Sequence, residues 1–255
     1  MQKRSIELIP RSWWQLKDEI WVFHWCYDTL NLPHLLPRKN GVSFLSPEEL
    51  VDRCSEIQEK IDIILHLRSQ DSKDIHTCNT RINNLLNNWV SEVLLVTWDT
   101  VWEWNILKTH EILIDDMSQR NISVALDLYK YNYWRFTSKF DYLQRNNSAN
   151  IFSQPIFSHE YWWKITNLLD TIWIENERFY TGVTLIENSN SREYWKNINN
   201  IPESNLPKWE TSGVIRRNSF AIASEILQES RQKGYSDYIM VMRSEVSSIL
   251  DLCKN

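Results

Sequence analysis

The chain has 255 residues and a formal net charge of −5 from 28 Lys+Arg and 33 Asp+Glu, with 14 Trp but only 4 Gly and 7 Pro. That length is enough for one large domain with a sizeable core. The weak negative charge excludes the overall positive field that is typical of nucleic-acid binding. The sequence has no G-x-G-x-x-G, G-x-x-x-x-G-K or G-x-S-x-G motif, which excludes the usual nucleotide-binding loops and the nucleophile elbow. So few glycines also argue against parallel α/β folds and β-sandwiches.

The cysteines and the hydropathy pattern bear on where the protein resides. The four cysteines form no C-x-x-C pair, so neither a zinc knuckle nor a thioredoxin-type site is predicted. The first residues, MQKRSIELIPRSWW, lack the apolar stretch of a signal peptide, and no window approaches 18 uncharged apolar residues. We therefore expect a soluble, reduced, cytoplasmic protein without a transmembrane segment.

Glycine and proline are absent from residues 48–154, a run of 107 residues. Strands need turns, and turns are usually rich in these two residues, so such a run favours long helices. The expected helices cover approximately residues 12–30, 48–65, 75–113, 118–143, 158–180, 214–233 and 236–252.

Several sequence signals support these boundaries. Ser12 and Ser158 are candidate N-caps, and Ser46-Pro47-Glu48-Glu49 is a strong start signal. Gly182 follows the helix expected over 158–180, and Gly234 separates the last two helices. We therefore predict a single all-α domain over residues 1–255, built as a bundle of seven or eight helices.

One polar pattern is typical of a metal site. In ITNLLDTIWIENERF, a spacing of four separates Asn167, Thr171 and Glu175, which would place the three side chains on one face of a helix. Amide, hydroxyl and carboxylate oxygens are suitable ligands for Mg²⁺. The alternative interpretation is the solvated face of an amphipathic helix, and the sequence leaves both open.

The pattern N-x-x-x-T-x-x-x-E resembles the second metal-binding motif of class I terpene synthases, an all-α family. Asp28, in IWVFHWCYDTLN, stands where the resemblance places a first metal motif, and Arg120 stands where it places an arginine that contacts the diphosphate. The resemblance implies an Mg²⁺-dependent lyase, with Mg²⁺ held by Asp28 and the three residues above. It implies a prenyl diphosphate as substrate and Arg120 as the catalytic contact to it.

The carbocation formed from such a substrate would need an apolar pocket with aromatic walls. We select five tryptophans as candidate lining residues: Trp21, Trp25, Trp98, Trp102 and Trp163. The first four form two i, i+4 pairs, a spacing that is also typical of a helical core. For that reason we expect these four to be largely buried.

Two other functions stay open. A non-catalytic helical protein could use its tryptophan-rich surface to bind a protein partner or an apolar ligand. A helical bundle could instead hold a metal between histidines and carboxylates. The candidate pairs are His24 with Asp28, Glu103 with His110, and His159 with Glu160. Asp115 and Asp116 are interpreted as favourable charge at a helix start. The sequence predicts no oligomeric state.

Overall fold

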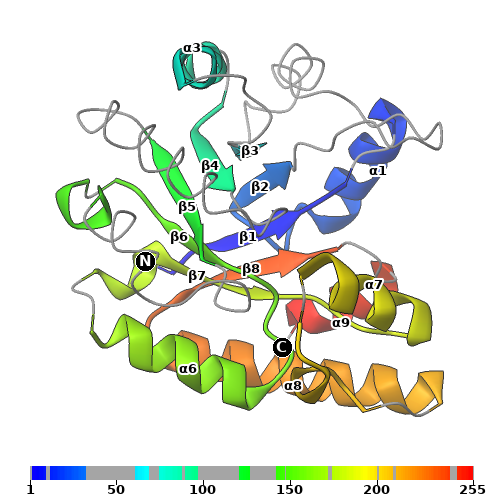
Figure 1. Ribbon diagram of the computed structural model, residues 1–255. Coiled ribbons are helices and arrows are strands. Elements are labelled where there is room, and N and C mark those ends of the chain that lie inside the picture. Colours follow the sequence, from blue (N-terminus) through cyan, green and yellow to red (C-terminus); the bar gives the residue numbers. More distant parts are fainter. Residues whose placement is uncertain are drawn as a thin grey trace.

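A computed structural model describes residues 2–9, 12–32, 61–68, 75–87, 90–96, 121–126, 142–146, 148–171, 174–199, 201–208, 211–241 and 246–254 (Figure 1). Helices and strands alternate along most of this length. The elements are β1 (Arg4–Glu7), α1 (Trp13–Phe23), β2 (Thr29–Leu32), β3 (Asp62–Arg68), α3 (Ile75–Leu86), β4 (Glu92–Val96), β5 (Ile122–Leu126), β6 (Ile151–Ser153), α6 (His159–Leu169), η3 (Asn176–Arg178), β7 (Phe179–Val183), α7 (Ser189–Asn199), η4 (Glu203–Asn205), α8 (Ser212–Gln232), β8 (Ser236–Met240) and α9 (Val246–Lys254).

The strands pair in parallel and in chain order from β1 to β8, and they close into a barrel. Closure is made by β1 and β8, where Ser5 pairs with Tyr238 and Glu7 with Met240. In Figure 1 the strands form the centre of the molecule, while α6 and α8 run along its outside. A closed barrel of eight parallel strands with helices outside is the (β/α)8, or TIM, barrel. The predicted all-α bundle is therefore wrong.

The strands of the glycine-free run explain this error. Residues 62–68 (DIILHLR), 92–96 (EVLLV) and 122–126 (ISVAL) are mainly apolar runs of strand length. Strands covered on both faces, as in a parallel barrel, show such runs without alternation. Their residues also match helical spacing when they are joined to neighbouring segments, which is how long helices were predicted here.

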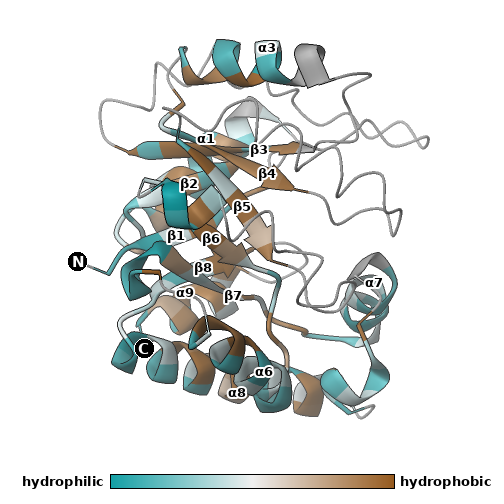
Figure 2. Cartoon of the chain, turned by 60° about the vertical axis from the view of Figure 1, so that its left-hand side comes forward, coloured by the Kyte–Doolittle hydropathy of each residue, from teal (hydrophilic) through white to brown (hydrophobic). Residues whose placement is uncertain are grey.

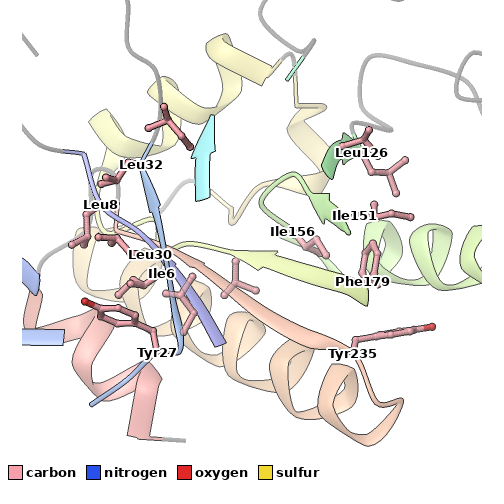
Figure 3. Packing of buried hydrophobic residues seen from close by; sticks show 14 of the residues in the cluster. Ile6, Leu8, Tyr27, Leu30, Leu32, Leu126, Ile151, Ile156, Phe179 and Tyr235 are labelled. Atoms are coloured by element: carbon pink, nitrogen blue, oxygen red, sulfur yellow. The ribbon is translucent and has the colours of Figure 1, made fainter. Parts of the chain in front are cut away.

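Two layers of side chains pack on opposite faces of the barrel. Alternate strand residues such as Leu65 and Leu95 belong to a large cluster with helix residues such as Ile226. Figure 3 shows part of this layer, with Ile6 and Leu30 among its labelled members. The strand residues in between form a second cluster that fills the barrel interior. Hydropathy follows this arrangement: the strands in Figure 2 are mostly brown, and α6 and α8 carry both brown and teal.

The helices predicted to start at residues 12, 75, 158 and 214 correspond to α1, α3, α6 and α8, and of these α8 also ends close to its predicted end. The starts predicted near residues 48 and 118 lie outside the described residues, and the helix predicted from residue 236 is wrong because β8 stands there. Ser12 and Ser158 are N-caps whose side chains accept hydrogen bonds from the N–H groups of Gln15 and Tyr161. Each capped helix ends after 11 residues; β2 follows α1, and η3 and then β7 follow α6. Gly234 does separate two elements and has a φ of 87°, but the second element is β8 and not a helix. Within the described part of the chain, none of the helices is long and apolar enough to cross a membrane.

Gly182 lies inside β7, although the sequence suggested that it ends a helix. A Cβ atom at this position would lie 2.9 Å from the carbonyl oxygen of Gln154 and would also collide with that of Ser153. The absence of a side chain therefore lets β7 approach the end of β6 closely. At this close distance the Gly182 N–H donates a hydrogen bond to Ser153 Oγ, at 2.7 Å.

Candidate functional site

Polar side chains from four strands meet inside the barrel. Glu7 ends β1, Asn31 lies near the end of β2, His66 lies in β3, and Tyr238 lies in the middle of β8. All four are buried. Because strands in a closed barrel direct alternate residues inward, these side chains share the interior, toward the carboxyl ends of the strands. We call this set the Glu7 cluster.

The hydrogen bonds of the Glu7 cluster connect β8 to β3. Tyr238 O–H donates to Glu7 Oε2, and His66 Nε2 lies 3.8 Å from the same oxygen. His66 Nε2 also lies 3.2 Å from Asn31 Oδ1. Since the Asn31 amide nitrogen donates to Ser5 Oγ, its oxygen is the atom that faces His66. We therefore assign a proton to His66 Nε2, which it donates to Asn31.

The electrostatics of Glu7 are set by its burial. Removal of the carboxyl group from water raises its pKa from the ordinary 4.5 to about 8. At neutral pH the group is therefore mainly a neutral carboxylic acid. Its second oxygen, Oε1, is buried and finds no hydrogen-bond partner among the described residues. The carboxyl group thus has one oxygen bonded to Tyr238 and one without a hydrogen-bond partner among the described residues.

Aromatic rings pack around Tyr238. Phe152 stacks on Tyr180 with ring centroids 4.3 Å apart and meets Tyr238 edge to face at 5.2 Å. The His66 ring also meets Tyr238 edge-on, at 6.5 Å. Such contacts favour one orientation of the Tyr238 ring. Its O–H is therefore directed at Glu7 by packing as well as by the hydrogen bond.

A second buried carboxyl group lies at the opposite end of the barrel. Glu92 begins β4, and its two oxygens lie 3.0 and 2.9 Å from Asn150 Nδ2. Ser123 O–H also donates to Glu92, and Ser123 Oγ accepts from the Asn150 N–H at 2.7 Å. Burial raises the pKa of Glu92 to about 8, although the Asn150 hydrogen bond opposes the shift. Both Glu92 oxygens therefore have hydrogen-bond partners. We call Glu92, Ser123 and Asn150 the Glu92 cluster.

The structure places Asp28 away from the Glu7 cluster. Asp28 precedes β2, at the amino-terminal ends of the strands, and is exposed. Its Oδ2 accepts a hydrogen bond from the Arg4 N–H at 2.9 Å. His24 is the C-cap of α1, so His24 and Asp28 do not share a helix. Its Nδ1 is 2.6 Å from Trp21 O.

The predicted column of Asn167, Thr171 and Glu175 does not form on one helix. α6 ends at Leu169, so only Asn167 lies within it. Thr171 follows the helix and donates to Leu168 O at 2.6 Å, and Glu175 precedes η3 in extended conformation. All three side chains are exposed.

Metal binding by these residues stays a prediction. Among the described residues no group of three or more His, Cys, Asp or Glu side chains is arranged to hold a metal ion. His159 pairs with Glu225 at 2.9 Å, and its neighbour Glu160 pairs with Lys164 at 2.7 Å. Arg120, Glu103 and His110 lie outside the described residues.

The expected burial of the tryptophans is wrong where the structure tests it. Trp21 is 75 % exposed and Trp25 is 49 % exposed. The buried face of α1 instead carries Leu16 and Phe23, so the i, i+4 tryptophan pair lies on the outer side. Trp163 is 64 % exposed on α6 and lines no interior surface. Trp98 and Trp102 lie outside the described residues.

Sequence reasoning missed every member of the Glu7 cluster. A signal was present, because each of three strands interrupts an apolar run with one polar residue: Glu7 in SIEL, Asn31 in LNL and His66 in ILHL. A buried polar side chain at the centre of a strand must find a partner inside the barrel. That argument needs the strands to be recognised first. Residues 4–7 lie outside every predicted helix, and β2, β3 and β8 overlap segments that were predicted as helices.

Comparison with known proteins supports the fold. No protein-family model matches the sequence, and no match was found among curated proteins. A chitinase domain from Pyrococcus furiosus has a similar structure, with a TM-score of 0.58 and 8 % sequence identity. The alignment covers 94 % of this chain and 83 % of the chitinase chain. A Clostridium thermocellum protein that binds 5-methyl-5,6,7,8-tetrahydrofolic acid has a TM-score of 0.57 and 13 % sequence identity. The alignment covers 98 % of this chain and 93 % of that protein. The DAHP synthase of Thermotoga maritima, an aldolase, has a TM-score of 0.57 and 8 % sequence identity. The alignment covers 99 % of this chain and 67 % of the synthase chain.

These similarities overturn the resemblance to terpene synthases. The structural neighbours are TIM-barrel proteins, and the chain itself forms a closed parallel barrel. The resemblance depended on a helix long enough to present Asn167, Thr171 and Glu175 together, and that helix ends at Leu169. The prenyl diphosphate cyclase and its helical alternatives are therefore wrong.

Proposed function

We propose that this protein is an enzyme that transfers a proton to a small polar substrate, with Glu7 as the general acid. The observation that carries the proposal is a fully buried carboxyl group with a pKa of about 8 and one unpartnered oxygen. An acid with a pKa close to the working pH is partly protonated and still transfers its proton readily. A buried group with no role would be expected to have both oxygens hydrogen-bonded.

The position of Glu7 supports the same function. Active sites of TIM-barrel enzymes lie at the carboxyl ends of the strands, whereas the opposite end contributes to stability. Glu7 is the last residue of β1, and Asn31 and His66 lie toward the same ends of β2 and β3. Glu7 Oε1, which has no partner among the described residues, is the oxygen that we propose transfers the proton to a substrate bound at this end.

Each neighbour of Glu7 has a role in this proposal. Tyr238 donates to Oε2 and so leaves the proton on Oε1, the oxygen without a described partner. When Glu7 gives up its proton, its new negative charge lies 3.8 Å from His66 Nε2. The N–H of His66 can stabilise that charge, while Asn31 holds the imidazole ring in position. Tyr238 and Asn31 are positioning residues, and Glu7 is the catalytic residue.

The chemistry of the donor limits the reaction class. A neutral carboxylic acid can protonate a carbonyl oxygen or the oxygen of a leaving group, which are steps of aldol-type cleavage and of hydrolysis. The named activities of the structural neighbours differ from one another, with chitinases beside an aldolase. Likeness of fold therefore selects no substrate, and the proposal is limited to proton transfer.

The test is a search for turnover that depends on Glu7. A mixture of small polar metabolites is incubated with the wild-type protein, Glu7→Gln and Glu92→Gln, and the mixture is followed by mass spectrometry. Glu92→Gln is the matched control because it makes the same change in a second buried carboxyl group of equally raised pKa. We expect compounds consumed by the wild type and by Glu92→Gln but not by Glu7→Gln. Consumption that is equal in all three proteins, or absent from all three, would contradict the proposal.

A further inference from the structure

Two cysteines from distant parts of the chain meet outside the Glu7 cluster. Cys26 lies in the turn between α1 and β2, where its N–H donates to Phe23 O at 2.7 Å. Cys253 lies in the last turn of α9. Each thiol is close enough to the other to affect its pKa, and both are free and buried. Both belong to the apolar layer between barrel and helices.

The surroundings of this pair connect the first and last elements of the barrel. Arg4 of β1 donates from Nη1 to Cys253 O at 3.5 Å, and its main-chain N–H donates to Asp28, two residues after Cys26. On its other side, α9 is tied to α8 by a hydrogen bond of 2.6 Å from Arg216 Nη2 to Ser248 Oγ. Arg4 of β1, the strand that pairs with β8, therefore holds the end of α9 and the turn after Cys26 near each other.

We propose that Cys26 and Cys253 form a reversible disulfide site that links α9 covalently to the turn before β2. The geometry that carries this proposal is the set of hydrogen bonds by which Arg4 joins Cys253 O to Asp28, two residues after Cys26, with both thiols buried in the same cluster. The bridge would close a loop containing most of the chain. Such a link restricts the unfolded chain strongly.

The oxidant is a small-molecule disulfide of the glutathione class. The thiolate of one cysteine attacks a sulfur of the oxidant, which forms a mixed disulfide and releases one small thiolate. The second cysteine loses its proton and attacks the protein sulfur of the mixed disulfide, which forms the protein disulfide and releases the second small thiolate. Two protein thiols are thereby oxidised while one small disulfide is reduced to two thiols.

Burial determines the rate of this reaction. Desolvation raises the pKa of both thiols, and it does so most strongly at Cys253. The pKa of Cys26 is less perturbed, so its thiolate makes the first attack, and the reaction accelerates as the pH rises toward 9. The oxidant also needs a transient opening of α9, which makes the bridge slow to form.

The experiment treats the full chain with oxidised glutathione at about pH 8.5 and digests it without reducing agent. Mass spectrometry should find a peptide containing Cys26 joined to one containing Cys253. The oxidised protein should unfold about 5–15 °C above the reduced one, and dithiothreitol should reverse the shift. Cys26→Ser and Cys253→Ser serve as controls that retain the size of the side chain and should show no shift.

Three results would overturn the proposal. One is a mixed disulfide with glutathione as the only stable product, and another is a bridge that uses Cys54 or Cys78 instead. The third is a Cys26–Cys253 bridge that lowers the unfolding temperature, since it would show that the two sulfurs cannot join without distorting the barrel. None of these readouts depends on the activity of the Glu7 cluster.

Discussion

The two buried carboxyl groups of this barrel have the same raised pKa but differ in what surrounds them. Glu92 has both oxygens hydrogen-bonded by Asn150 and Ser123 at the amino-terminal ends of the strands. Glu7, at the carboxyl ends, has one oxygen bonded to Tyr238 and the other without a described partner. A raised pKa therefore reports burial in both cases. The unpartnered oxygen and the end of the barrel on which it lies separate a candidate site from a structural network.

The largest expected difference between the two carboxyl groups is in catalysis. Once a substrate is known, Glu7→Gln should lower kcat by a factor of about 10²–10⁴, because the amide cannot supply the proton. Glu92→Gln should leave kcat within a few-fold of the wild-type value. Steady-state kinetics of the three proteins at one pH provides the measurement. A comparable loss in both variants would show that the two ends of the barrel are not functionally distinct.

The second difference lies in how stability depends on pH. The folded pKa of Glu7 is raised to about 8 from the ordinary 4.5, so its stabilising contribution is complete below pH 4.5 and lost as the pH rises through 8. The shift corresponds to about 4–5 kcal/mol of unfolding free energy for a fully buried group. Glu7→Gln should therefore resemble the wild type near pH 5 and exceed its stability near pH 9.

Urea unfolding at the two pH values measures this effect. Glu92→Gln should remove a similar part of the pH dependence, since the pKa of Glu92 is also raised to about 8. The two carboxyl groups are thus expected to be alike in stability and unlike in catalysis. A wild-type protein whose stability is the same near pH 5 and near pH 9 would refute both raised pKa values.

A smaller effect should follow from disrupting the Glu92 cluster. Asn150→Ala removes the amide that contacts both Glu92 oxygens and leaves Ser123 as the side-chain donor. Leaving a buried acceptor short of partners should cost roughly 1–3 kcal/mol of unfolding free energy. The pKa of Glu92 should rise further, because the hydrogen bond that lowers it is lost. Chemical denaturation at neutral pH checks the cost, and turnover should not change.

The smallest effect is expected at Tyr238. Tyr238→Phe removes the O–H that donates to Glu7 but keeps the ring that packs on Phe152. The unfolding free energy near pH 5 should fall by about 1 kcal/mol, the usual net contribution of one hydrogen bond. A hydrogen bond to a carboxylate favours its ionised form, so the pKa of Glu7 should rise above 8. The stability transition with pH should then move to higher pH, and movement to lower pH would contradict the assigned hydrogen bond.

Local features of the fold could be predicted from the sequence, while its class could not. The caps Ser12 and Ser158 and the break at Gly234 are present because each depends on a few neighbouring residues. The strands between residues 62 and 153 were missed because turns were expected to need Gly or Pro. Here Asn146 makes a turn with its own side chain, since its Oδ1 accepts from the Ser148 N–H at 3.1 Å.

The candidate site could not be predicted from the sequence for a related reason. Glu7 and Tyr238 are 231 residues apart and meet only because β1 pairs with β8. No spacing rule within a helix or a strand brings such residues together. The residues that the sequence did select, Asn167, Thr171 and Glu175, were chosen for a helical spacing that the structure interrupts after Leu169.

The pairing of β1 with β8 also has a consequence for the order in which the protein is made. Synthesis runs from the amino terminus, so Glu7 emerges before its partner Tyr238, which follows 231 residues later. At typical rates of about 5–20 residues per second, that interval lasts on the order of 10–50 s. During it the carboxyl group has no Tyr238 to bond and no closed barrel to exclude water, so it ionises as an ordinary glutamate. The neutral acid on which the proposed function depends is thus a property that the nascent chain acquires only when the last strand is inserted.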